Sequence, residues 1–165
     1  MSNLRRFFHD QKSDGQHGQS LVEFALLLPI MLLIITGLFD VARAVWEENT
    51  LAYAAREGTR YLIVHGSAGS PASDPTGEPP CPPNPCGATQ TAIDTVRNAA
   101  IGVPNVTVVV TWPDIYPTTI VHCADRNCRV AVEASAPFIP LPSQYLLGGA
   151  FQITLRGGSQ LVIQR

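Results

Sequence analysis

Four cysteines in two equally spaced pairs are the residues with the clearest potential for chemistry. Four residues separate Cys81 from Cys86, and four separate Cys123 from Cys128. Local disulfides, crossed disulfides, a zinc site and free thiols are all open from this spacing. Disulfides are favoured if the domain is exported, and structural zinc sites usually have shorter spacing. We therefore expect these cysteines to stabilise the fold, with no metal and no cofactor.

An enzyme would need a nucleophile beside a base, and the sequence offers little of this kind. His65, His122, Asp114 and Ser143 lie in unrelated contexts. There is no glycine-rich nucleophile turn and no pair of histidines at metal-ligating spacing. His122 precedes Cys123 and is more typical of a structural histidine. A net charge of −2 gives no indication of nucleic-acid binding. We expect no catalytic residue and no nucleic-acid partner.

A long apolar run contains the one acidic residue whose position is costly. No charged residue occurs between Phe24 and Phe39. With Leu21 and Val41 added, the run is about as long as a bilayer core requires, which predicts one membrane-spanning helix. Glu23 lies just inside its amino-terminal edge, where an unpaired ion is expensive. This carboxylate either reaches the headgroups along its own stem or needs a cation as partner.

Three motifs follow one another in the first third of the chain. They are Gly18-Gln-Ser-Leu-Val-Glu-Phe-Ala-Leu-Leu-Leu-Pro29, Gly37-Leu-Phe-Asp-Val-Ala-Arg43 and Ala54-Ala-Arg-Glu-Gly-Thr-Arg60. Together they resemble the TadE-like proteins of tight-adherence (Flp-type) pilus systems, which are similar to type IV pilins. The resemblance covers Gly18 to about Tyr61 well, and the rest of the chain only in general layout.

The first motif also resembles the processing site of type IV prepilins, where a membrane peptidase cuts after a glycine. The resemblance implies cleavage between Gly18 and Gln19, so that Glu23 becomes the fifth residue of the mature chain. Its carboxylate would then pair with the new terminal amine of a neighbouring subunit, which offsets the desolvation cost of both ions. Glu23 and Phe24 are therefore the expected assembly residues.

The expected organisation has four parts: a leader over 1–18, a transmembrane helix over 19–40, an amphipathic stalk helix over 41–65, and an extracytoplasmic globular domain over 66–165. Residues 66–88 are rich in proline and glycine and predict a long loop. Charges flanking the span are nearly balanced and do not decide its orientation. The prepilin resemblance and the paired cysteines place the carboxyl-terminal part outside. The precursor is thus expected as a single-pass protein of the cell membrane, and the assembled form in an extracellular pilus.

The stalk helix is expected to carry one apolar stripe and a charged remainder. At 3.6 residues per turn the stripe includes one charged residue, Glu48, and otherwise comprises Val41, Val45, Leu51, Ala52, Ala55, Thr59, Leu62 and Ile63. The remaining surface takes Asp40, Arg43, Glu47, Arg56, Glu57 and Arg60. Asp40 with Arg43, and Glu57 with Arg60, are three residues apart and can pair on the helix surface. These pairs are either solvated charges or bridges between subunits.

The predicted fold is α+β and pilin-like. A long amino-terminal helix, kinked or locally melted at Pro29 and ending near His65-Gly66, packs with a short helix on an antiparallel sheet of four or five strands. Thr89–Ala100 is the short helix, with Gly102 as its cap. Alternating residues predict strands at Val106–Trp112, Thr118–Cys123, Cys128–Ala136, Phe151–Leu155 and Leu161–Ile163. Gly157-Gly158 predicts a tight turn or a bulge, and Pro137–Pro142 is not expected in central sheet.

Two functions fit these observations. The first is a pilin-like structural subunit or assembly component of a tight-adherence pilus. Its partners would be other pilin or pseudopilin subunits, a prepilin peptidase, the inner-membrane pilus assembly machinery and membrane lipid. The alternative is an uncleaved, single-pass, membrane-anchored binding module. A domain secreted after Ala42-Arg-Ala44 is discounted, because that cut would divide the amphipathic helix. The first residue of the mature protein separates them: Gln19, Met1 or Val45.

Overall fold

The structure is a computed structural model that describes residues 14–66, 87–115, 122–146 and 148–164, with the single positions 69, 73 and 117. Most of the expected leader, most of the 66–88 loop, and both Cys81 and Cys86 lie outside the described residues. So does most of the strand expected at Thr118–Cys123. In the described part of that segment, His122 forms an isolated antiparallel bridge with Ile115.

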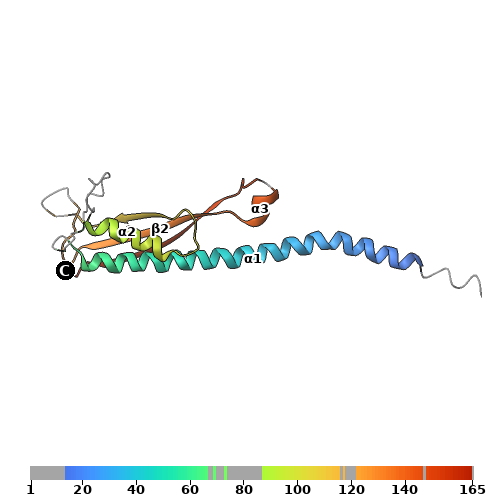
Figure 1. Cartoon of the computed structure of the whole chain (residues 1–165), viewed down its shortest axis with the longest axis horizontal. Helices are drawn as coiled ribbons and strands as arrows, with labels where there is room; N and C mark the ends of the chain where they lie inside the picture. Colours follow the sequence, from blue (N-terminus) through green and yellow to red (C-terminus); the bar gives the residue numbers. More distant parts are fainter. Residues whose placement is uncertain are drawn as a thin grey trace, which may run out of the picture.

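One long helix, α1, runs from Asp14 to Val64 and dominates the molecule (Figure 1). It ends at the residue before His65-Gly66, as predicted, but it begins upstream of the expected start at Gln19. Pro29 lies within it and does not interrupt it. Proline removes one backbone hydrogen bond, but the helix continues through Pro29 without local melting, and its apolar half is bent (Figure 1).

Three strands form one antiparallel sheet in the order β1-β2-β3. They are β1, Thr107–Thr111; β2, Arg129–Phe138; and β3, Ile153–Val162. Two short helices complete the α+β fold: α2, Gly87–Ala99, and α3, Leu141–Leu146. Gly102, the predicted cap beyond α2, has a φ of 78°, a conformation that favours glycine. The predicted fold class is confirmed, but the described residues form three strands, not four or five.

Gly157-Gly158 is neither a turn nor a bulge. The two short strands expected on either side of it are one continuous strand, β3, whose register against β2 runs unbroken through both glycines. Gly157 lies against the backbone of α1, where an added Cβ would overlap the main-chain atoms of Leu51 and Ala52. The glycine therefore serves close packing of a strand on a helix, a role that the sequence pattern does not distinguish from a turn.

Pro137 also departs from expectation, because it lies within β2, the central strand of the sheet. It pairs with Thr154 of β3. Pairing of β2 with β1 ends at Ser135, so at Pro137 the central strand has a neighbour on one side only. Proline is tolerated at such an edge-like position, since no second ladder requires its missing N–H.

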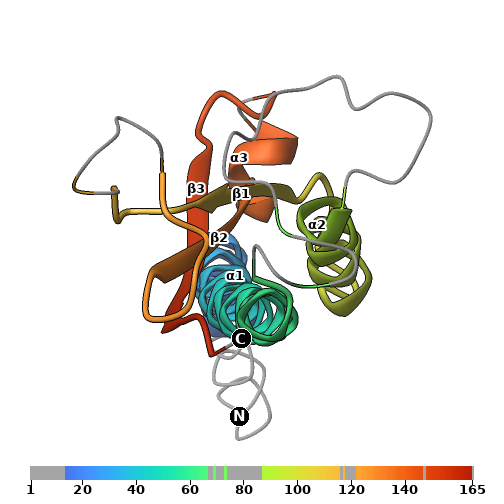
Figure 2. The same cartoon turned by 90° about the vertical axis from the view of Figure 1, so that its left-hand side faces the viewer.

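The helices α1 and α2 lie side by side on one face of the sheet (Figure 2). The predicted alternation of β2 is confirmed, with Val130, Val132 and Ala134 buried and Arg129 and Glu133 exposed. On the α1 side the core consists of Leu51, Ala54, Ala55, Thr59 and Leu62. Small residues let the backbones approach closely. At Gly58, for example, a Cβ would overlap Val96 of α2.

The predicted stripe is wrong at the start of the stalk. Val41 and Val45 are 62% and 53% exposed, whereas the charged residues Asp40 and Glu47 are buried at 7% and 3%. The stripe was inferred from hydrophobicity alone, and each buried carboxylate has a partner that hydrophobicity does not reveal. Those partners, the Leu141 N–H and Arg43, lie at the junction between the two halves of α1.

Candidate assembly and membrane-anchoring surface

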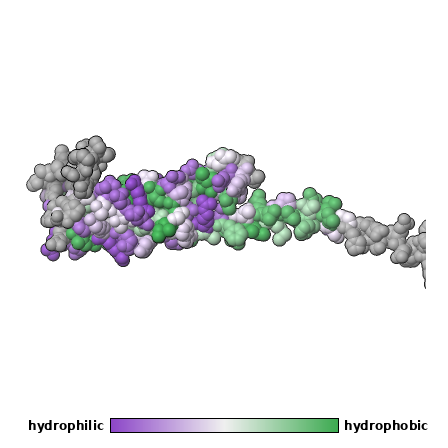
Figure 3. Space-filling model, in the orientation of Figure 1, coloured by the Kyte–Doolittle hydropathy of each residue, from purple (hydrophilic) through white to green (hydrophobic). Residues whose placement is uncertain are grey.

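Among the described residues, only α3 lies against the apolar half of α1, which we define as Leu21–Phe39. Its large hydrophobic side chains are all exposed, by 41% for Leu28 up to 71% for Leu38. Figure 3 shows this half as a mostly hydrophobic rod that projects from a globular part of mixed polarity. In length and composition it is the one helix of the described chain able to cross a membrane. The Thr36 hydroxyl is satisfied internally, because it donates to the Leu32 carbonyl at 2.9 Å.

At the amino-terminal edge of the apolar half lie the predicted processing and assembly residues. The side-chain amide of Gln19 donates to Glu23 at 3.1 Å, and both residues are exposed. An added Cβ at Gly18 would meet no atom within 4 Å, so packing within this chain does not require a glycine there. Phe24 is 62% exposed. Among the described side chains, Glu23 thus has a neutral, local partner.

The junction between the two halves of α1 is held by Asp40, which accepts a hydrogen bond of 2.9 Å from the backbone N–H of Leu141. Leu141 is the first residue of α3, and helix starts have N–H groups without internal partners. A carboxylate there supplies both an acceptor and a favourable charge. Asp40 therefore joins α1 to a residue that lies 101 positions further along the chain.

Arg43 reinforces the junction but does not pair with Asp40 as predicted. Its Nε lies 2.9 Å from Glu47 Oε1, and its guanidinium lies 4.8 Å from the centre of the Phe138 ring. The burial of Asp40 and Glu47 argues against a bridge from either of them to another subunit. The residues that face outward here are instead Val41, Val45 and Trp46, each more than half exposed.

The second predicted pair, Glu57–Arg60, is present at 3.1 Å. The Arg60 side chain is 67% exposed, so the pair contributes little to stability. Most of the motif around it, Ala54–Arg60, has a packing role. Ala54, Ala55 and Thr59 are fully buried, and the Thr59 hydroxyl donates to the Ala55 carbonyl at 2.7 Å. The small residues of this motif thus let α2 and the sheet contact α1.

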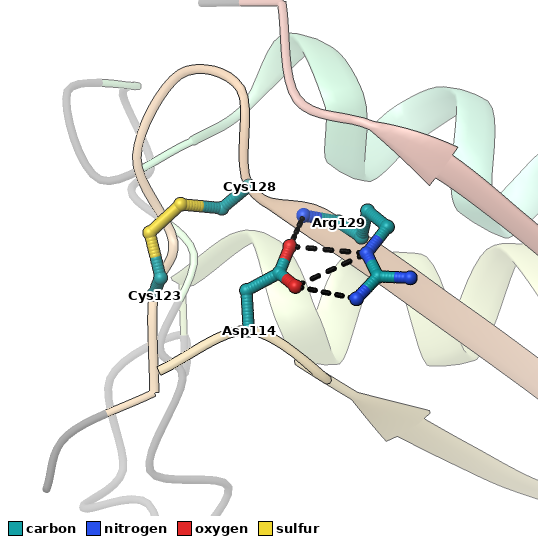
Figure 4. A network of polar contacts seen from close by, with 4 residues as sticks. All are labelled: Asp114, Cys123, Cys128 and Arg129. Carbon is teal, nitrogen blue, oxygen red and sulfur yellow. Dashed lines mark hydrogen bonds and ion pairs between the residues drawn. A yellow bond between two sulfur atoms is a disulfide. The ribbon is translucent and has the colours of Figure 1, made fainter. Parts of the chain in front are cut away.

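A disulfide joins Cys123 to Cys128, one of the local pairings left open by the spacing (Figure 4). It closes the loop that leads into β2. Beside it, Arg129 binds Asp114 through its backbone N–H at 2.7 Å and its guanidinium at 2.7 Å, a pair that sequence reasoning missed. Hydrogen bonds from Arg129 hold the pKa of Asp114 below its ordinary value. No sequence signal indicates this pair, because 15 positions separate the two residues.

The other chemistry-bearing residues do not converge on a site. His65 stacks on Tyr61 and shares a 2.9 Å hydrogen bond with its carbonyl oxygen, while Asp114 is occupied by Arg129. Within the described ranges, no three residues of the metal-ligating types form a cluster. Among the described residues, the feature that points to a role beyond folding is the exposed apolar half of α1, with Glu23 at its edge.

Comparison with known proteins identifies this part of the chain. A family model described as TadE-like protein matches residues 18–60, the segment that carries the three motifs. No curated protein and no solved structure matches the chain. The resemblance expected from the motifs is thus confirmed. Residues 18–60 are similar to TadE-like proteins, and this likeness supports a component associated with tight-adherence pili.

Proposed function

We propose that this chain is a pilin-like structural subunit or assembly component of a tight-adherence pilus, cleaved after Gly18 and assembled through the apolar half of α1. The observation that carries the proposal is the exposure of every large hydrophobic side chain in that half. Burying one such side chain is worth about 1.5–3 kcal/mol. A surface of this kind is stable only inside a membrane or among neighbouring helices.

The same surface serves two successive states. As a precursor, the chain waits in the cell membrane with α1 as its single span and the globular domain outside. During assembly the apolar half exchanges lipid for the corresponding helices of neighbouring pilin or pseudopilin subunits. One heterologous contact, repeated by a helical operator, builds a filament instead of a closed ring.

Cleavage gives Glu23 a cationic partner in addition to its bond with the Gln19 side-chain amide. The Gly18–Gln19 bond lies inside α1, so the peptidase must first open the initial turns of the helix. Gly18 favours that opening, because glycine weakens a helix by about 0.5–1 kcal/mol relative to alanine. The new amine on Gln19 then pairs with Glu23 of a neighbouring subunit. The pair offsets two desolvation costs within an apolar layer.

Amino-terminal sequencing of the protein from cells that make pili tests the processing step. The expected first residue is Gln19. Met1 would identify an uncleaved, membrane-anchored binding module, and Val45 a secreted domain. Either result overturns the proposed assembly route. A Gly18→Ala variant should keep Met1, whereas Gly37→Ala, which changes a glycine with equally open surroundings, should be processed normally.

Removing the charge of Glu23 tests the pairing step. Glu23→Gln keeps the size of the side chain and its bond to Gln19, so we expect cleavage to continue and incorporation into pili to be lost. Glu23→Ala should behave in the same way. Gln19→Ala is the matched control, because it removes the neutral partner but leaves the amine, and it should assemble. The readout is the ratio of cleaved to pilus-incorporated protein by immunoblot. Normal incorporation of cleaved Glu23→Gln would exclude the ion pair.

A further inference from the structure

A groove opens between α1 and α3, and its walls are almost entirely apolar. Its volume is about 500 Å³, and it is lined by Pro29, Leu32, Leu33 and Thr36 of α1 and by Leu141, Pro142 and Tyr145 of α3. The α1 wall consists of residues from the apolar half. The globular domain therefore does not stop where the apolar half begins but continues alongside it.

The depth of this groove follows from helix geometry. Asp40 is the first charged residue after the apolar half, and it holds the first residue of α3 by the bond to Leu141. The α1 wall lies four to eleven residues before Asp40, which is about 6–16 Å along the axis at the α-helical rise. Figure 1 shows α3 at the end of the sheet that faces the apolar half. If the apolar half spans a bilayer, α3 lies below its surface.

The composition around α3 suits this position. No charged residue occurs from Ala134 to Leu155, the longest uncharged stretch in the chain. Within it Tyr145 is 78% exposed and Phe151 is 56% exposed. Phe151 comes two residues before β3, which starts opposite Phe138. Aromatic side chains of this kind gather where a membrane protein crosses the headgroup region.

We propose that α3 and Phe151 insert into the extracytoplasmic leaflet beside α1, with lipid acyl chains filling the groove. Interfacial segments bury their apolar faces about 5–10 Å below the headgroup boundary, a range that overlaps the shallow part of the groove. The carboxylate of Asp40 satisfies the backbone N–H at the start of α3, so this donor is not left exposed to lipid. The inference rests on the proposed membrane span and adds a second, non-spanning contact with the membrane.

The competing occupant is the apolar helix of a second copy. Lipid is favoured because one wall of the groove belongs to the span itself, so acyl chains are present at that depth before any assembly. A fixed position of α3 in the leaflet would also set the height and tilt of the globular domain above the membrane. The precursor would then be presented to its partners in one orientation.

Photo-crosslinking of the full-length chain in vesicles of phosphatidylethanolamine and phosphatidylglycerol identifies the occupant directly. We would replace Tyr145 by p-benzoylphenylalanine, an aromatic residue that reacts with nearby C–H bonds. Leu33, in the span, is the positive control. Tyr53, 56% exposed on α1 beyond Asp40, is the matched tyrosine control outside the membrane. Mass spectrometry then separates lipid adducts from adducts between chains.

We expect lipid adducts at positions 145 and 33 and none at position 53. Adducts between chains at position 145 would overturn the inference in favour of a second copy. Lipid adducts at position 33 with no adduct at position 145 would overturn it while leaving the span intact. If lipid adducts formed at neither position 33 nor position 145, the proposed membrane span would be rejected as well. The two proposals therefore fail in distinguishable ways.

Discussion

The two halves of α1 belong to one uninterrupted helix, yet they meet their surroundings in opposite ways. In the half before Asp40 the large hydrophobic side chains are exposed, whereas in the half after it Leu51, Ala54, Thr59 and Leu62 are almost completely buried. The two halves of α1 also differ in residue composition. The first half consists mainly of leucine, isoleucine and phenylalanine. The second places alanine, glycine and threonine where α2 and β3 contact the helix. The small residues therefore let α2 and β3 approach α1 around the buried Leu51 and Leu62, whereas the apolar half exposes its leucines and isoleucines.

Leucine-to-alanine substitutions in the two halves should give the largest contrast. Leu62 is 1% exposed, so Leu62→Ala should lower the free energy of unfolding by about 2–5 kcal/mol through lost burial and a cavity. Leu33 is 59% exposed, so Leu33→Ala should change it by no more than about 0.5 kcal/mol. Denaturant unfolding of both variants in detergent, followed by circular dichroism, measures the difference. Equal losses would mean that the apolar half is packed within the chain.

Adjacent glycines of β3 provide a sharper test of close packing. A Cβ at Gly157 would overlap the backbone of α1, so Gly157→Ala should cost about 1–3 kcal/mol through overpacking. At Gly158 the nearest atom to an added Cβ is the Val132 carbonyl oxygen at 3.8 Å, an ordinary contact. Gly158→Ala should therefore be close to neutral. Thermal unfolding of the two variants side by side is the measurement. A neutral Gly157→Ala would contradict the close contact of β3 with α1.

The smallest expected effect concerns the stability of the globular domain in acid, where the Asp114–Arg129 pair contributes. Arg129 lowers the pKa of Asp114 from its ordinary 3.8. The pair therefore stabilises the fold above that value and ceases to do so as pH falls through the lower folded-state pKa. The melting temperature of the wild type should fall more steeply below pH 3.8 than that of Asp114→Asn. Parallel slopes would show that the pair does not contribute.

Sequence reasoning succeeded where the signal is local. It predicted the end of α1, the second helix, the core face of β2 and the Glu57–Arg60 pair, all of which depend on periodicity or on neighbours within a turn. It failed at Gly157-Gly158 and at Pro137. Glycine and proline suggest a break in a strand. At Gly157, however, the glycine allows close contact with α1, and at Pro137 the proline is tolerated because the pairing of β2 with β1 ends at Ser135. It also assigned Val41 to the packed face and Asp40 to the surface, which the structure reverses.

By itself the sequence determined the apolar half, the acid at its edge and the family motifs, because each is a run or spacing of residues that has meaning without a partner. Only the tertiary structure decided which acids are buried, since Asp40 depends on a backbone N–H at Leu141, 101 positions away. The position of α3 beside Leu32 and Leu33 of α1 was likewise decided only by the tertiary structure. Such contacts arise when distant segments fold together, and no local pattern encodes them.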